Sequence, residues 1–133
     1  MPLDKIEISE LLKKEEIVFI ATTKPDGSPH LVPIWFIYYK GKIYFETDIT
    51  TVKFKNIKKR NKISLCFGGK RTYIIEGRVK WYKEEELGFP IRKMYWGKYG
   101  KDMEDSYITD KTLIFEVIPE KEMSWHYADE GWE

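Results

Sequence analysis

Apolar and polar positions alternate most regularly in residues 72–82, which read TYIIEGRVKWY. Apolar side chains fall on one face of this segment and charged side chains on the other. This alternation predicts a half-buried antiparallel strand. Runs rich in β-branched and aromatic residues predict five more strands. These are expected at residues 17–23, 30–39, 43–47, 62–67 and 112–118.

Short turns and few helices separate the expected strands. The segments KPDGS (residues 24–28) and KGK (residues 40–42) have the composition of hairpin turns. Helical patterns are confined to residues 4–14, 51–60 and 83–99, the last interrupted at Pro90. We therefore expect a mainly β fold, with six strands in an antiparallel barrel or strongly coiled sheet. A chain of 133 residues suits a single domain, residues 1–133.

The segment between the third and fourth expected strands is the first candidate for a binding site. The strand ends in a Thr/Asp/Thr turn that opens a strongly basic helix. Such a turn directs unpaired backbone N–H groups and the positive end of the helix dipole to one place, which suits a phosphate group. A solvated basic helix with ordinary threonine caps explains the same residues. The segment alone leaves both interpretations open.

A proline interrupts the second expected strand. Pro33 lies within the run HLVPIWFIYY and is followed closely by Trp35. Because proline has no N–H to donate to a strand ladder, Pro33 marks an edge, a bulge or a place where the backbone is open to a ligand.

Composition narrows the possible chemistry. The net charge of +1 argues against nucleic acid as a partner, and no segment has the pattern of a signal peptide or a spanning helix. The only cysteine, Cys66, is expected to be a small core residue, and a single cysteine excludes an internal disulfide and a multi-cysteine metal site. A zinc or iron site is not expected, because neither histidine has a cysteine or a third histidine at metal-ligand spacing. We expect a cytoplasmic protein without a metal. Aromatic residues make up 16% of the chain, more than a small core easily buries, so some are expected at a ligand pocket or subunit interface, or half-covering the sheet.

Four segments in order make the chain recognisable. They are HLVPIWF, KGKIYFET, TDITTVKFKNIKKRNKISLCF and IIEGRVKWY. In this order and spacing, residues 8–119 resemble the pyridoxamine 5′-phosphate oxidase-like family, the flavin-binding split β-barrels. The most specific part is the T-x3-[ST]-x-K pattern formed by Thr47, Thr51 and Lys53.

The resemblance implies a six-stranded antiparallel split β-barrel and a homodimer that holds FMN in a groove between its subunits. Thr51 and Lys53 match the residues that hold the flavin phosphate, and the strand from His30 to Trp35 matches the one beside the flavin ring. Thr72 stands at the position of a flavin-contacting glutamine, and Lys55, Lys70 or Arg71 is available to supply a missing positive charge. The residues that the resemblance assigns to the cofactor are His30, Val32, Pro33, Ile34, Trp35, Thr47, Asp48, Thr51, Lys53, Arg71 and Thr72.

The departures from the family pattern bear on the substrate. His30 and Trp35 stand where the oxidase has arginine and lysine, and Val52 replaces a second basic residue. No arginine follows Arg92, whereas the oxidase grips its substrate with a C-terminal arginine and histidine. We therefore expect a protein that is not a true pyridoxamine 5′-phosphate oxidase.

The sequence leaves the function open within limits. No convincing set of protein-supplied catalytic groups is present, so the leading hypothesis is an FMN-dependent oxidoreductase acting on an unassigned small-molecule substrate or electron donor. Trp125 and His126 are candidates for shaping its substrate pocket, although His126 also fits a structural role. The alternatives are the same fold with a deazaflavin or a haem, a scaffold protein with a vestigial flavin groove, and a nucleic-acid contact through the basic helix.

Overall fold

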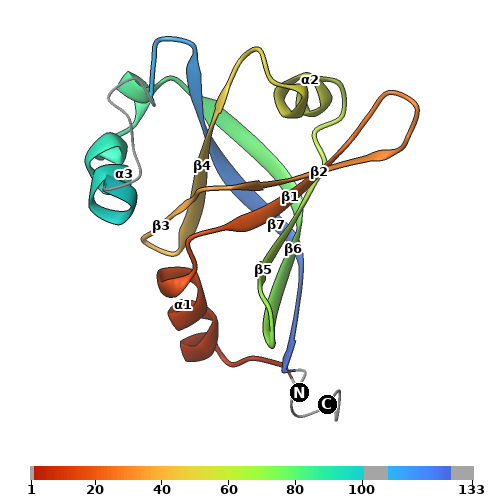
Figure 1. The fold of residues 1–133 in the computed structure, drawn as a ribbon, viewed down its shortest axis with the longest axis vertical. Helices are drawn as coiled ribbons and strands as arrows, with labels where there is room; N and C mark the ends of the chain where they lie inside the picture. The colour runs from red at the N-terminus through yellow and green to blue at the C-terminus, as the bar shows by residue number, and fades with distance from the viewer. Residues whose placement is uncertain (1, 101–107, 127–133) are drawn as a thin grey trace.

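The computed structural model describes residues 2–100 and 108–126. Seven strands form one antiparallel sheet in the order β2-β1-β5-β6-β7-β4-β3, which curls into a split barrel (Figure 1). The strands are β1 (Val18–Thr23), β2 (Pro29–Ile34), β3 (Ile37–Tyr39), β4 (Lys42–Asp48), β5 (Ile63–Gly68), β6 (Arg71–Tyr82) and β7 (Thr112–His126). The helices are α1 (Lys5–Lys14), α2 (Val52–Lys59), the short 3₁₀ helix η1 (Glu84–Glu86) and α3 (Ile91–Tyr99). The predicted mainly β split barrel is confirmed.

The strand count differs from the predicted six because the second expected strand divides in two. β2 pairs with β1, whereas β3 pairs with β4, so the chain passes from one edge of the sheet to the other at residues 35–36. The backbone of Phe36 forms hydrogen bonds with side chains of α3 instead of with a neighbouring strand. Its N–H donates to the Tyr99 hydroxyl at 3.1 Å, and its carbonyl accepts from Lys98 Nζ at 3.1 Å. These bonds replace the ladder at the crossing.

The last strand is longer than predicted. The expected strand ended at Ile118, before Pro119, but β7 continues to His126 beside β6. The pairing shifts between Glu76 and Gly77, where Gly77 faces Pro119. A bulge accommodates the missing proline N–H. It also requires glycine, because a Cβ on Gly77 would lie 2.2 Å from the Ile118 carbonyl oxygen.

Capping residues fix two helices. Asp4 and Glu7 form a reciprocal capping box that begins α1, and Thr51 caps α2 through its hydroxyl. Within α1, Leu11 and Leu12 are buried, whereas Ile6 is 70% exposed. Among the described residues, no helix is long and apolar enough to span a membrane.

Two clusters of buried side chains support the sheet. The larger cluster fills the barrel and includes Phe36, Phe45 and Phe115, which are completely buried. The smaller one lies between α3 and the β3–β4–β7 part of the sheet and includes Tyr95 and Tyr99. Cys66 belongs to neither cluster, so the prediction of a core cysteine is wrong. It lies half-buried on the other face of β5, where burial raises the pKa of its thiol.

Candidate functional site

A groove of about 380 Å³ lies where the end of β4 meets the start of α2. We call it the α2 N-terminal groove. β2 and the crossing at residues 35–36 form its second wall. Its lining residues are Ile17, Pro33, Ile34, Trp35, Glu46, Thr47, Asp48, Thr51 and Lys53. Seven of the sequence-predicted cofactor residues are therefore brought together here: Pro33, Ile34, Trp35, Thr47, Asp48, Thr51 and Lys53.

The turn between β4 and α2 is held by its own side chains. Asp48 Oδ1 accepts hydrogen bonds from the backbone N–H and the hydroxyl of Thr50, both at 2.8 Å. These bonds stabilise the carboxylate and lower the pKa of Asp48. Thr51 Oγ1 donates to the Asp48 carbonyl at 2.9 Å and accepts from the Phe54 N–H at 3.2 Å. The turn is thus rigid before any ligand binds.

The first turn of α2 retains capacity for an anion. The first four N–H groups of a helix have no partner within it. The Thr51 hydroxyl accepts from Phe54, and the Thr51 carbonyl accepts from Lys55 at 3.2 Å. Neither of these bonds uses the N–H groups of Val52 and Lys53, which lie at the positive end of the helix dipole.

Lys53 supplies the positive charge of the groove. Its side chain is half-buried, and burial lowers its pKa, partly offset by the Glu46 carboxylate. A lysine held in this way gains when a second anion approaches, because its lost hydration is replaced. Glu46 was not foreseen from the sequence. Neighbouring residues of a strand point to opposite faces, and Glu46 directly precedes Thr47. The sequence therefore gave no sign that Glu46 would also face the groove.

Thr47 carries the most informative atom of the groove. Its side chain is 2% exposed, and its hydroxyl oxygen is buried without a hydrogen-bond partner among the described residues. Leaving a buried hydroxyl unsatisfied costs about 1–3 kcal/mol. Because Thr47 lines the groove, a ligand with acceptor oxygens would satisfy it. The residues present therefore fit a phosphate group.

Trp35 forms a wall of the groove that is supported from behind. Its ring stacks on Tyr99 with centroids 4.3 Å apart and an interplanar angle of 2°. The Tyr99 hydroxyl is fixed in turn, because it donates to the Glu16 carbonyl at 2.7 Å. Sequence reasoning missed Tyr99, since nothing in its helical segment distinguishes it from neighbouring aromatic residues. The orientation of Trp35 is thus set by α3.

The remaining residues predicted on β2 lie beside the groove. His30 and Val32 point to the inner face of the sheet, where His30 pairs with Thr22 of β1 and Val32 packs against the core. His30 Nδ1 is buried without a hydrogen-bond partner among the described residues. Neither side chain lines the groove, although both belong to the strand that forms its wall.

Four further predicted residues gather at the opposite end of the barrel. Arg71 pairs with His126, and Thr72 pairs with Trp125, across β6 and β7. His126 Nε2 lies 2.8 Å from a carboxylate oxygen of Glu7, which also faces Arg71 at 3.8 Å. Figure 1 shows α2 at one end of the sheet and the β5–β6 turn at the other, near the start of α1. Within one chain, these residues do not meet the α2 N-terminal groove.

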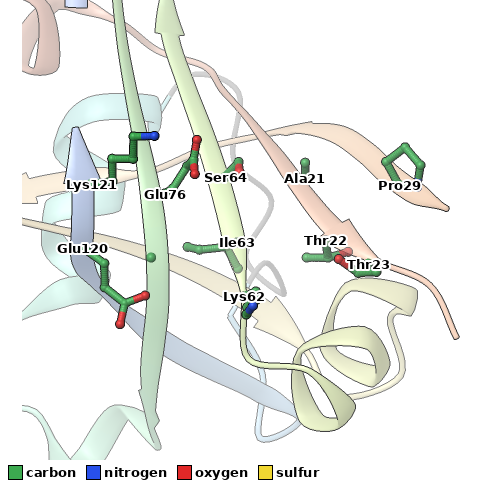
Figure 2. A pocket seen from close by; sticks show the side chains of 11 residues that line it. Ala21, Thr22, Thr23, Pro29, Lys62, Ile63, Ser64, Glu76, Glu120 and Lys121 are labelled. Atoms are coloured by element: carbon green, nitrogen blue, oxygen red, sulfur yellow. The ribbon is translucent and has the colours of Figure 1, made fainter. Parts of the chain in front are cut away.

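The outer face of the sheet carries a polar hollow of about 450 Å³. The strand register places Ala21, Ser64, Glu76 and Lys121 in one row across it, as Figure 2 shows. Its charges are mixed, and a metal is not indicated. No group of three or more histidine, cysteine, aspartate or glutamate side chains within residues 2–100 and 108–126 is placed to hold an ion.

Apolar side chains continue along the same outer face. Leu31 is 64% exposed and Phe19 is 46% exposed. Phe19 pairs with Pro33 on one side and with Cys66 on the other. An exposed apolar surface of this kind is typical of an interaction face.

The fold and the groove together define a split-barrel protein with a phosphate-compatible site. The pyridoxamine 5′-phosphate oxidase family profile matches residues 5–126, and the chain belongs to this family. No protein of curated function matches the sequence.

Solved structures share the fold. The conserved hypothetical protein Rv2991 from Mycobacterium tuberculosis is 20% identical, with a TM-score of 0.77 over 97% of this chain and 88% of its own. A pyridoxamine 5′-phosphate oxidase-related, FMN binding protein from Nostoc punctiforme is 14% identical, with a TM-score of 0.70 over 93% and 84%. An F420 reductase is 21% identical, with a TM-score of 0.71 over 86% and 94%. At these identities the similarity establishes the fold alone.

Proposed function

We propose that this protein binds FMN in the α2 N-terminal groove and acts as an oxidoreductase on a small-molecule substrate or electron donor. The single observation that carries the proposal is the buried, unsatisfied hydroxyl of Thr47 beside the capped start of α2. Membership of the family and the FMN-binding neighbour from Nostoc punctiforme support it.

Each residue of the groove has a separate task. The Thr47 hydroxyl and the first N–H groups of α2 donate to phosphate oxygens, and Lys53 supplies charge. Pro33 and Trp35 present an apolar wall that would exclude water from a bound flavin ring. When bound, FMN would supply hydride transfer, for which these residues provide position and electrostatics. No residue of the groove is assigned a proton-transfer role.

The complete site requires a homodimer in this proposal. The outer face exposes Leu31 and Phe19, which a second copy of the chain would cover. A twofold arrangement could also bring Arg71, Thr72, Trp125 and His126 of one copy to the groove of the other. Leu31→Glu is expected to shift the protein toward monomer in sedimentation experiments and to weaken FMN binding.

The substrate is expected to differ from that of the named oxidase, because no arginine follows Arg92 in the sequence. Turnover of pyridoxamine 5′-phosphate with excess FMN is the direct measurement. We expect none above background, and a robust rate would contradict this part of the proposal.

The cofactor is tested by the absorbance spectrum of the purified protein, mass spectrometry of any released cofactor, and FMN titration. We expect Lys53→Met to weaken FMN binding by about tenfold or more, because it removes a charge-assisted bond from a partly buried site. Lys55→Met is the matched control, since Lys55 is exposed and lies outside the groove. A colourless protein that does not bind added FMN would contradict the proposal and favour a scaffold. Release of a deazaflavin would retain the site but change its occupant.

A further inference from the structure

A second pocket, of about 580 Å³, lies at the other end of α2. We call it the α2 C-terminal pocket. It is formed by the last two turns of α2 and by the start of the β1–β2 turn, which projects beside the helix in Figure 1. Its lining residues are Thr23, Lys24, Pro25, Lys55, Asn56, Lys58, Lys59 and Arg60. It shares no lining residue with the α2 N-terminal groove.

Five of the eight lining residues are cations, and none of the eight is an acid. No ion pair is formed by these five cations among the described residues, whereas several other basic side chains are paired. Arg78 with Glu120, and Arg92 with Glu84, are examples. In a chain with a net charge of +1, an unpaired group of this size is a local concentration of positive charge.

One carboxylate of the β1–β2 turn, that of Asp26, interacts electrostatically with Lys24. Asp26 accepts hydrogen bonds from the Ser28 N–H at 3.0 Å and the Ser28 hydroxyl at 2.6 Å. These bonds, and the charge of Lys24, lower the pKa of Asp26. Asp26 therefore remains ionised and interacts with Lys24, but it is not among the residues that line the pocket.

Helix stabilisation explains only part of the cluster. Lys58 and Lys59 lie in the last turn of α2, where cations interact favourably with the helix dipole. The Lys58 ammonium also lies 5.4 Å from the centre of the Phe54 ring. This explanation does not account for Lys24, which comes from another segment, or for the hollow between the two segments.

The wall of the pocket includes a buried, fixed polar residue. Asn56 is 4% exposed, and its side-chain Nδ2 donates to the Thr22 hydroxyl at 3.0 Å. This bond ties α2 to β1 at the wall of the pocket. The cationic side chains therefore surround a hollow whose wall includes a buried, hydrogen-bonded residue.

We propose that the α2 C-terminal pocket is a second anion site, which binds a small molecule carrying two or more phosphate groups. Several cations converging on one hollow favour a compact polyanion over a single charge. Single-stranded nucleic acid is disfavoured, because none of the lining residues is an aromatic on which a base would stack. The site is separate from the proposed flavin groove and does not depend on it.

The test is calorimetric titration of the full-length protein, as purified, with inorganic triphosphate and with ADP. We expect saturable binding that weakens as salt is added. Lys24→Gln combined with Lys59→Gln should weaken both ligands by about tenfold, since each exposed charge contributes modestly. Lys80→Gln combined with Lys93→Gln is the control, because both lysines are exposed and lie outside this pocket.

Further measurements separate this proposal from the flavin proposal. Lys53→Met, designed to loosen FMN, should leave triphosphate binding unchanged, and triphosphate should not displace FMN. Absence of saturable binding, or an equal loss in the control variant, would overturn the proposal. Tighter binding of single-stranded DNA of about twelve nucleotides than of triphosphate would also overturn it and assign the surface to nucleic acid.

Discussion

The two ends of α2 present two different ways of attracting an anion. At the N-terminal end, the groups are few and set in the fold: the buried Thr47 hydroxyl, the capped first turn and the half-buried Lys53. At the C-terminal end, Lys24 and Lys59 belong to a group of five exposed cations on long, flexible side chains.

Because of this difference, the N-terminal groups are suited to selecting one ligand, and the C-terminal cations are suited to attracting anions in general. A buried hydroxyl discriminates strongly, because a ligand either satisfies it or leaves it unpaired. Exposed charges act over a longer range, accept many geometries and are screened by salt. We therefore expect the N-terminal groove to be selective for one cofactor and the C-terminal pocket to accept any compact polyphosphate.

The largest expected effect comes from removing the support of the N-terminal groove. Tyr99→Leu removes the ring that stacks on Trp35 and the hydroxyl that holds Phe36. The free energy of unfolding should fall by about 3 kcal/mol in urea denaturation, as for other truncations of buried aromatic residues. Tyr99→Phe keeps the ring and should lose about half as much. Equal stability of all three proteins would show that the crossing does not depend on α3.

The pH dependence of stability tests the same support. Burial lowers the pKa of Lys98 from 10.5 to about 8. Between these two pH values the unfolded chain holds more protons than the native protein, so this residue makes the free energy of unfolding rise with pH. After allowance for partial exposure, we expect a rise of about 1–2 kcal/mol that Lys98→Met lacks. Parallel pH profiles for the two proteins would contradict the burial of this charge.

Thr47→Val tests whether the unsatisfied hydroxyl serves a ligand. Without ligand, the variant should be more stable by about 1 kcal/mol, because a buried polar group without a partner is removed. FMN binding should nevertheless weaken by about tenfold. Thr47→Ser keeps the hydroxyl and should retain affinity. A variant that binds FMN as tightly as the parent would leave Thr47 as a structural residue only.

The smallest expected effect is a difference between the two sites in how strongly salt weakens ligand binding. Raising the ionic strength should weaken FMN binding only slightly, because Lys53 is partly buried, and should weaken triphosphate binding more steeply. Titrations of both ligands over one salt series provide the measurement. Identical salt slopes would mean that the two ends of α2 do not differ in kind.

Local interactions made part of the site predictable. The turn from Thr47 to Lys53 is closed by bonds between residues two or three apart, such as Asp48 with Thr50 and Thr51 with Phe54. Side-chain patterns of this length are present in the sequence itself. The barrel, the hairpins and the start of α2 were likewise predicted from patterns in the sequence.

Long-range bonds set the features that the sequence did not reveal. The break between β2 and β3 depends on Tyr99 and Lys98, which are 63 and 62 residues away from Phe36. The bulge that extends β7 past Pro119 depends on Gly77 of the neighbouring strand. The convergence of Lys24 with α2 depends on how the hairpin packs beside the helix. Only the folded chain brings such pairs together.

The crossing at residues 35–36 also has a consequence for the order of folding. It joins the two outermost strands of the sheet, so the hairpins β1–β2 and β3–β4 can each form from neighbouring residues. The pairings of β1 with β5 and of β4 with β7 close much longer loops, and such contacts form slowly. We expect two early hairpins linked by a short tether, which become parts of one sheet only after β5, β6 and β7 have assembled between them.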